Sequence, residues 1–372
     1  MHVAVLGAGY AGVALARNLE DRLPEAVSLT VVDERDTHLV QHLVHRAVRY
    51  PGVADELTVP FEALFDRATH RQARVTDLDP DAGRAVLSDG DLEFDVGAVA
   101  LGAETNFYGL SGVESSATPL KRLEHAERIR ERFLDVCAAD GRTVVAGAGL
   151  SGVQVSGELA ALADERGSDA TVTLLEREPT VAPSFPDRFR RAVREELDDT
   201  AVDVRTGRTV TGVADDAVAL ARGDEVAFDQ LVWTGGITGG EPLAERPVVR
   251  ANLRLGDSTF AVGDAARVVD EDGEAVPASA QTAVREADVA ATNIERLAAH
   301  RRTGGDGFEP RLARYGYTSL GWLVSVGDGA VAQVGPTVLR GEAAKTAKTT
   351  VAAGYLGSLG AVDRAMAYVQ DH

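Results

Sequence analysis

The sequence predicts an α/β protein in which one strand–turn–helix–strand unit occurs twice. Three observations lead to this prediction. An apolar strand runs into a Gly-x-Gly-x-x-Gly turn at residues 2–12, the same pattern returns at residues 143–152, and each following helix leads to a strand that ends in an acidic residue. Strand, helix and parallel strand form the repeating unit of Rossmann-like folds. The expected fold class is therefore α/β with two Rossmann-like domains.

The first unit occupies the start of the chain. Residues 2–6 form a short apolar strand, a helical pattern covers residues 13–23, and a second strand over residues 28–32 ends in Asp33. The turn between the first strand and the helix contains Gly7, Gly9 and Gly12.

The second unit repeats this order. Residues 143–146 form the strand, residues 153–163 the helix, and residues 171–175 a strand that ends in Glu176. Its turn contains Gly147, Gly149 and Gly152.

The repeat also predicts the domain boundaries. A strand at residues 96–101 ends in Gly102, and the following residues lead out of the first unit near residue 108. The chain is expected to return before a strand at residues 259–262. The predicted parts are a first domain of residues 1–108 and 253–305, an inserted domain of residues 109–252, and a C-terminal module of residues 306–372.

Further elements are expected after the second domain. Ser279 is a suitable cap for a long helix that reaches His300. In the C-terminal module, alternating residues over 321–334 predict a hairpin around Gly327-Asp328-Gly329, and a helix is expected to begin near Gly341.

The two glycine turns indicate dinucleotide binding. A pyrophosphate carries two negative charges, and such a turn lets the backbone approach it while the helix N-terminus supplies N–H donors. The acid on the next strand then accepts from ribose hydroxyls, a role that falls to Asp33 and Glu176. Glu176 would repel the 2′-phosphate of NADPH and so favours NADH, although Arg177 could hold that phosphate instead.

A third motif indicates a flavin. Residues 260–264 form an apolar strand that ends in Gly263-Asp264, where the acid suits a hydrogen bond from a ribityl chain. The N-terminus of the helix after Ser279 could face the flavin ring, where negative charge develops on reduction. Arg285 could assist from this helix, although a solvated arginine is the simpler interpretation.

Composition excludes several classes of function. Asp and Glu number 58 against 38 Lys and Arg, and the formal net charge of -20 argues against a nucleic-acid partner. Lysine occurs only at Lys121, Lys345 and Lys348, and an acid-rich, lysine-poor chain is typical of halophiles, because strong salt screens acidic self-repulsion. No signal-peptide pattern and no apolar run of roughly 18 residues is present, so a cytoplasmic protein with peripheral membrane contact at most is expected.

Eight segments carry a resemblance to a known family. They are VAVLGAGYAGVALA, VVDERDTHLVQHLV, VALGAETNFYGLSGVE, VVAGAGLSGVQVSGELA, VTLLEREPTVAPSF, LVWTGGI, FAVGDAARV and ASAQTAVREA. With these segments the chain resembles the two-dinucleotide-fold flavoproteins related to glutathione reductase, and within them the type II NADH dehydrogenases. The resemblance implies FAD held by the first and third motifs, NADH on one flavin face, and a quinone near Ala280 and Gln281.

The resemblance also implies site residues. Those implied for FAD are Gly7, Gly9, Gly12, Asp33, Glu34, Gly102, Gly263, Asp264 and Ala280. Those implied for NADH are Gly147, Gly149, Gly152 and Glu176, and the implied catalytic residues are Gln281, Arg285 and Gln154.

The chain departs from the family's pattern in three places. Gln154 stands where the family often has an acid, although Glu158 follows one helical turn later, and the family's AQxAxQ helix reads AQTAVR here. Residues 340–369 are only modestly apolar, with Arg340, Lys345 and Lys348 near their start. This segment could dock on anionic lipid, pack on the protein or form a homodimer contact.

Three histidines have a spacing that could suggest a metal site. His38, His42 and His45 are spaced at four and three residues, which would place them on one helical face, yet packing or proton transfer near the flavin is the preferred interpretation and no metal is expected. The single Cys137, expected as a small core residue, excludes the cysteine-pair chemistry of sulfide:quinone oxidoreductases and disulfide reductases.

The expected function is that of an FAD-dependent NADH:quinone oxidoreductase, cytoplasmic and peripheral on the inner face of the cell membrane. Two alternatives stay open. The chain could reduce a protein acceptor such as ferredoxin with NAD(P)H, or it could be a flavin-binding redox sensor that does not turn over.

Overall fold

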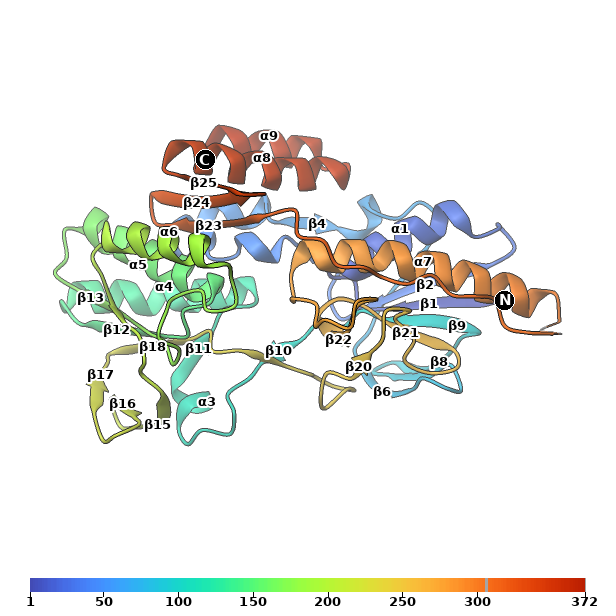
Figure 1. The fold of residues 1–372 in the computed structure, drawn as a ribbon, viewed down its shortest axis with the longest axis horizontal. Helices are drawn as coiled ribbons and strands as arrows, with labels where there is room; N and C mark the ends of the chain where they lie inside the picture. Colours follow the sequence, from blue (N-terminus) through green and yellow to red (C-terminus); the bar gives the residue numbers. More distant parts are fainter. Residues whose placement is uncertain (305–306, 372) are drawn as a thin grey trace. The chain divides into compact units, whose positions relative to one another are not determined.

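The computed structural model describes residues 1–304 and 307–371, so the predicted boundary between residues 305 and 306 lies outside the described residues. The chain forms two compact units, each built around a five-stranded parallel sheet (Figure 1). The first unit contains residues 1–40, 58–104 and 237–318. The second contains residues 41–57, 105–236 and 319–372. Two parallel sheets with helices on them confirm the predicted α/β class.

The parallel sheet of the first unit begins with the predicted strand of residues 2–6. Its strand order is β21-β9-β1-β2-β5, with bounds β21 (Thr259–Ala261), β9 (Val96–Val99), β1 (His2–Leu6), β2 (Ser28–Asp33) and β5 (Thr69–Gln72). Helices α1 (Tyr10–Arg22) and α7 (Ala280–Arg302) pack against each other over one face of this sheet (Figure 1). β1 and β9 are almost fully buried, which explains their uninterrupted apolar sequences.

Smaller elements complete the first unit. An antiparallel sheet contains β6 (Val75–Asp79), β7 (Arg84–Leu87) and β8 (Gly90–Glu93). The other short elements are β3 (Thr37–Leu39), β4 (Thr58–Pro60), η3 (Phe61–Ala63), β20 (Val248–Val249), η4 (Gly263–Ala265) and β22 (Arg267–Val268). The two-residue strands β10 (Glu104–Thr105) and β19 (Ile237–Thr238) pair where the chain passes between the units.

The second unit repeats the plan of the first. Its sheet has the order β11-β18-β12-β13-β14, with bounds β11 (Ala117–Pro119), β18 (Gln230–Trp233), β12 (Arg142–Ala146), β13 (Thr171–Leu175) and β14 (Val202–Arg205). The helices around it are α3 (Val113–Ser116), α4 (Leu123–Ala138), α5 (Leu150–Arg166) and α6 (Asp187–Asp198). An antiparallel sheet of β15 (Val210–Ala214), β16 (Ala217–Leu220) and β17 (Glu225–Ala227) is added. Cys137 is buried on α4, as predicted.

The C-terminal residues pack on the second unit. β23 (Trp322–Val326) and β24 (Gly329–Val334) form the predicted hairpin, and β25 (Thr337–Arg340) extends it. α8 (Glu342–Ser358) begins after Gly341, as predicted, and packs with α9 (Val362–Asp371) over this sheet (Figure 1). Residues 41–57 also belong to this unit and form η1 (Gln41–Leu43), α2 (Arg46–Arg49) and η2 (Pro51–Asp55).

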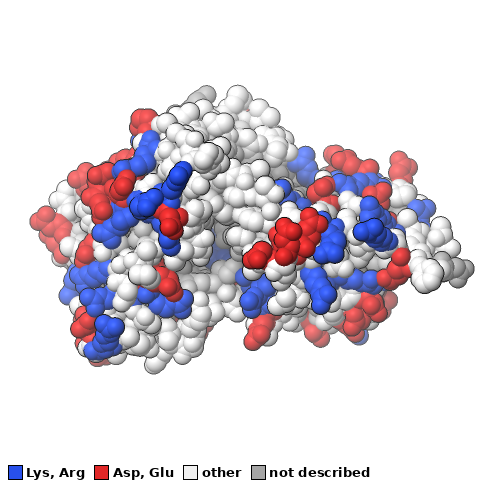
Figure 2. Space-filling view, in the orientation of Figure 1, with Lys and Arg blue, Asp and Glu red and all other residues white. Residues whose placement is uncertain are grey.

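Helices α8 and α9 expose apolar side chains. Val351, Val362, Met366 and Val369 are each about half exposed or more. The surface over these helices shows few charged side chains (Figure 2). Within the described part of the chain, no helix has the length and apolar character needed to span a membrane.

The predicted common face of the three histidines is wrong. His38 lies in β3, which pairs with β4, His42 lies in η1, and His45 precedes α2. A spacing of four and three residues requires one continuous helix to align side chains, and the chain is extended at His38. Among the described residues no group of His, Cys, Asp or Glu is placed to hold a metal ion.

Candidate functional site

The first glycine turn joins β1 to α1. Gly7 has a φ of +99°, a conformation that favours glycine, and a side chain there would collide with the backbone of Ala100 and Leu101. A Cβ at Gly12 would overlap the carbonyl oxygen of Gly7, so the helix can approach the turn only because residue 12 has no side chain. A Cβ at Gly9 would meet no atom within 4 Å. The turn is therefore closed toward the protein and open at Gly9.

Asp33 supports this turn from the end of β2. Its carboxylate accepts hydrogen bonds from the backbone N–H of Ala8 at 2.7 Å and of Arg35 at 3.0 Å. Burial raises the pKa of Asp33, while these two backbone hydrogen bonds lower it. The acid predicted to bind a ribose therefore also fixes the glycine turn.

The second glycine turn has the same construction. Gly147 has a φ of +103°, and a Cβ at Gly152 would overlap the carbonyl oxygen of Gly147. A Cβ at Gly149 would again meet no atom within 4 Å. The Glu176 carboxylate accepts from the N–H of Ala148 at 2.7 Å and of Glu178 at 2.8 Å. Both fingerprints thus have one closed side, one open side and an acid bonded to the turn.

Both turns fit a dinucleotide pyrophosphate. Gly9 and Gly149 cap α1 and α5, and neither cap position supplies a side-chain acceptor for the N–H groups of the first helical turn. Such N–H groups, together with the helix dipole, favour an anion. The open sides at Gly9 and Gly149 allow a phosphate to approach the backbone closely. These residues suit FAD and NADH as the resemblance implies.

The Gly263-Asp264 turn lies against the first fingerprint. A Cβ at Gly263 would lie 3.0 Å from Cβ of Ala11 on α1 and 3.4 Å from Cβ of Ala283 on α7. Arg246 donates to the carbonyl oxygens of Asp264 at 2.6 Å and Ala266 at 2.7 Å. A pocket opens beside the turn, and its lining includes Arg246, Gly263, Asp264, Ser279, Thr282 and Glu286. Asp264 therefore lines a pocket next to the first turn of α1.

Helix α7 begins directly after Ser279, as predicted. The hydroxyl of Ser279 accepts from the N–H of Thr282 at 3.2 Å and caps the helix, so Ala280 and Gln281 occupy its first turn and are partly exposed. Arg285, one turn further, donates to the carbonyl oxygen of Thr318. Ala280, Gln281 and Arg285 all lie in the first unit.

The two remaining residues implied for FAD lie elsewhere in the first unit. Glu34 forms an ion pair with Arg74 at 2.9 Å, and Gly102 follows β9 with a φ of +72°. Sequence reasoning missed Arg246 and Glu286. A signal for Glu286 existed, because it lies within the stripe of alanines at residues 283, 287 and 290 that forms the buried face of α7.

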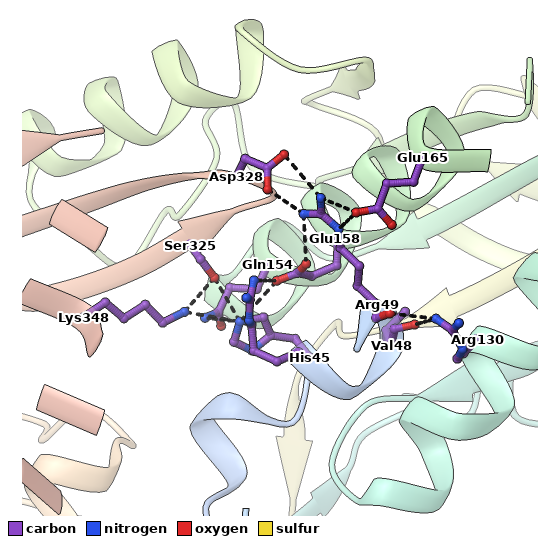
Figure 3. A network of polar contacts seen from close by, with 11 residues as sticks. His45, Val48, Arg49, Arg130, Gln154, Glu158, Glu165, Ser325, Asp328 and Lys348 are labelled. Carbon is purple, nitrogen blue, oxygen red and sulfur yellow. Dashed lines mark hydrogen bonds and ion pairs between the residues drawn. The ribbon is translucent and has the colours of Figure 1, made fainter. Parts of the chain in front are cut away.

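Gln154 lies in a buried polar cluster of the second unit (Figure 3). The cluster brings α5 together with His45, Ser325 of β23 and Lys348 of α8. Lys348 Nζ lies 2.6 Å from Ser325 Oγ and 3.2 Å from His45 Nε2. With its amide oriented to satisfy its neighbours, Gln154 accepts from Lys348 Nζ at 2.8 Å. The predicted catalytic glutamine thus holds the C-terminal module to α5.

Glu158 extends this cluster on the next turn of α5. It is fully buried, and its carboxylate accepts from Arg46 Nη1 at 2.9 Å. Burial raises the pKa of Glu158 and lowers that of Lys348 to about 7. Arg49, beside it, donates to Asp328 at 2.8 Å and pairs with Glu165 at 2.6 Å (Figure 3). Sequence alone could not foresee this cluster, because its members are up to 303 residues apart.

Comparisons with known proteins identify the family of this chain. A family model described as pyridine nucleotide-disulphide oxidoreductase matches residues 1–287. The demethylphylloquinone reductase of Synechocystis is 28% identical over 321 residues, with 78% of each chain covered. The type II NADH:quinone oxidoreductase of Staphylococcus saprophyticus is 24% identical over 329 residues, which cover 79% of this chain and 82% of the relative.

A solved structure shares the whole fold. The structure of NDH2 from Plasmodium falciparum in complex with NADH matches with a TM-score of 0.84, 15% identity, and coverage of 99% of this chain and 97% of that one. The likeness in structure supports the α/β fold with two Rossmann-like units. The chain belongs to the pyridine nucleotide-disulphide oxidoreductase family, in which it is similar to the type II NADH:quinone oxidoreductases.

Proposed function

We propose that this protein is an FAD-dependent oxidoreductase that oxidises NADH and reduces a quinone. One observation carries the proposal: the chain builds two separate glycine turns, each held by a carboxylate and each open to a pyrophosphate. The family binds FAD and NAD(H). A bound flavin supplies hydride acceptance from a reduced nicotinamide and transfer of electrons onward.

The first unit is the proposed FAD site. The α1 N-terminus would hold the pyrophosphate, Asp33 the adenosine ribose and Asp264 the ribityl chain. The close packing of Gly263 against Ala11 supports this, because it puts the Asp264 turn beside the first turn of α1. The second unit, with its open turn at Gly149, is the proposed NADH site.

Glu176 favours NADH over NADPH in this proposal. Its carboxylate is fixed by two backbone hydrogen bonds at the end of β13, where a ribose would lie. Arg177, the competing candidate for a 2′-phosphate, is exposed and donates to Glu178 at 3.2 Å. A guanidinium already paired with a neighbouring carboxylate is a weaker phosphate ligand than a free one.

A quinone is the proposed acceptor, with Ala280 and Gln281 at the α7 N-terminus as its contacts. The names of the two curated relatives, a demethylphylloquinone reductase and a type II NADH:quinone oxidoreductase, support this choice. Catalytic roles for Gln281, Arg285 and Gln154 stay predictions. Cluster geometry favours a positioning role for Gln154, since it bonds to Lys348.

Peripheral contact with the inner face of the cell membrane is proposed for α8 and α9. The basic residues expected to attract anionic lipid are engaged elsewhere: Arg340 pairs with three carboxylates of α6 and its end, Lys345 with Glu342, and Lys348 is buried. Support for a membrane contact therefore comes from the exposed apolar residues of α8 and α9 (Figure 2).

Anaerobic stopped-flow absorbance tests the proposal. NADH is expected to bleach the flavin of the wild-type protein rapidly, and a soluble quinone is expected to restore it rapidly. Bleaching without recovery by quinone would contradict the quinone and point to a protein acceptor or a sensor. A protein that binds no flavin would contradict the whole proposal.

Two matched variants assign the two sites. Gly9→Ala and Gly149→Ala each add one methyl group to an open position, so neither is expected to disturb the fold. Because the methyl group obstructs the pyrophosphate, Gly9→Ala is expected to lose FAD, whereas Gly149→Ala keeps FAD but is bleached by NADH at least about tenfold less efficiently. Loss of flavin from Gly149→Ala with retention in Gly9→Ala would reverse the assignment.

A further inference from the structure

A carboxylate without a cationic partner lies behind the Gly263-Asp264 turn. Glu286, on α7, is 1% exposed, and its Oε2 lies 2.7 Å from the backbone nitrogen of Gly263, which donates to it. In the described ranges, 1–304 and 307–371, no Arg, Lys or His forms an ion pair with Glu286. Glu286 also lines the pocket that contains Asp264. Two acidic side chains therefore share one partly closed space.

Burial and a second acid act against the ionised form of Glu286. Asp264 of the η4 turn is a second acid, and Tyr315, buried beside α7, has a hydroxyl with no hydrogen-bond partner. Arg246 is the nearby cation, but its guanidinium donates to the carbonyl oxygens of Asp264 and Ala266 and leaves the carboxylate unpaired. On the α1 side the turn meets Ala11, which carries no charge.

Burial and the charge of Asp264 both raise the pKa of Glu286. Burial, followed by the Asp264 charge, raises the pKa of Glu286 to about 8, although the Gly263 hydrogen bond and Arg246 oppose this. At neutral pH the side chain is then an uncharged carboxylic acid. Its carbonyl oxygen accepts from Gly263, and its hydroxyl is a donor that a carboxylate would lack.

We propose that Glu286 serves FAD binding as an uncharged carboxylic acid, a positioning residue that fixes the Gly263-Asp264 turn, and that its ionisation releases FAD. The proposal rests on the assignment of FAD to the first unit. Ionisation would add a negative charge beside Asp264 and close to the α1 turn, where the pyrophosphate already carries two. FAD therefore favours the protonated form, and protonation favours FAD.

Retention of FAD against pH tests the proposal. Released flavin is measured by fluorescence between pH 6 and 10 at fixed ionic strength, with circular dichroism to establish that the protein stays folded. The wild type is expected to hold FAD at pH 6 to 7 and to lose affinity above about pH 8, by up to about tenfold per pH unit for one linked proton.

Two glutamine variants of the same helix provide the comparison. Glu286→Gln keeps the shape and a donor but cannot ionise, so it is expected to hold FAD equally at pH 7 and pH 10. Glu295→Gln, on the same helix but outside the pocket, is the matched control and should follow the wild type. Equal pH profiles for Glu286→Gln and the wild type would overturn the proposal.

A second measurement covers the case in which Glu286→Gln does not fold. Infrared difference spectra of the wild-type holoprotein between pH 7 and 10 should show a protonated carboxyl band that disappears as FAD is released. Bound FAD that is retained without change to pH 10 overturns the role of Glu286 but leaves the proposed function intact. A purified protein without flavin overturns both.

Discussion

Asp33 and Glu176 occupy equivalent places in the two units, although one side chain is longer by a methylene group. Each accepts one N–H from the middle of its glycine turn and one from two residues further along the chain. A carboxylate serves both donors because each oxygen accepts independently. The sequence motif includes the acid for its contact with ribose, and the structure adds a second role in holding the turn.

Glu176→Gln separates these roles. The amide keeps one acceptor oxygen, so one of the two N–H groups loses its partner, at a cost of about 1–3 kcal/mol if it stays buried. The repulsion of a 2′-phosphate also disappears. We expect flavin bleaching by NADH to become about tenfold less efficient while the NADPH-to-NADH ratio of kcat/KM rises. An unchanged ratio in steady-state assays with both nucleotides would argue that Glu176 does not select the cofactor.

At the scale of elements, the strands and helices that carry the motifs could be predicted from sequence. The apolar strands before both glycine turns, the Ser279 cap and the hairpin of residues 321–334 all depend on local patterns, and the structure contains each of them. The predicted common face of the three histidines was wrong, because a local pattern could not show that His38 lies in a strand. β3 is extended because it pairs with β4, about twenty residues later, and a spacing rule does not detect a partner strand.

The buried polar cluster around Gln154 could not be predicted from sequence, for a related reason. From sequence, Lys348 is one of three basic residues near the start of residues 340–369, a segment that could dock on lipid, pack on the protein or form a dimer contact. In the structure it lies on the buried side of α8 and meets Ser325, His45 and Gln154. The face of α8 that is buried depends on where β23 and β24 lie, and this is a tertiary property. Site residues that belong to motifs could therefore be predicted from sequence, whereas the residues that hold them in place could not.

The pKa of Lys348 makes the attachment of α8 sensitive to pH. In the folded protein the pKa is lowered to about 7 from an ordinary value of 10.5, because burial disfavours the charged form. Between these values the unfolded chain binds a proton that the folded chain does not. The contribution of Lys348 to stability is therefore present above the upper value and is lost as pH falls toward 7.

Lys348→Met is the variant that reveals this contribution. The difference in unfolding free energy between wild type and Lys348→Met is expected to grow in favour of the wild type as pH rises from 7 to 10, by up to about 1.4 kcal/mol per pH unit. Lys345→Met, on the exposed side of the same helix and paired with Glu342, should show almost no dependence. Urea unfolding followed by circular dichroism measures both differences, and parallel pH profiles would contradict a neutral Lys348.

At the scale of the whole molecule, the net charge of -20 limits how the protein can approach other surfaces. Arg49, Arg254 and Arg340 are paired with acids in the described structure, so their positive charges are compensated locally. Approach to anionic lipid is then opposed by the long-range field of the protein, whatever the apolar residues of α8 and α9 contribute. The halophilic origin suggested by composition stays a prediction.

Salt separates these two contributions to membrane binding. If α8 and α9 dock through apolar side chains, binding to vesicles with anionic lipid is expected to strengthen with salt, as the Debye length falls from about 10 Å at 0.1 M to about 3 Å at 1 M. Met366→Glu should weaken this binding, whereas Val248→Glu, which adds the same charge on an exposed strand of the first unit, should not. Cosedimentation with vesicles measures the bound fraction. Tight binding that salt abolishes would instead indicate a basic contact, and no binding under any condition would leave α8 and α9 as a packing or dimer surface.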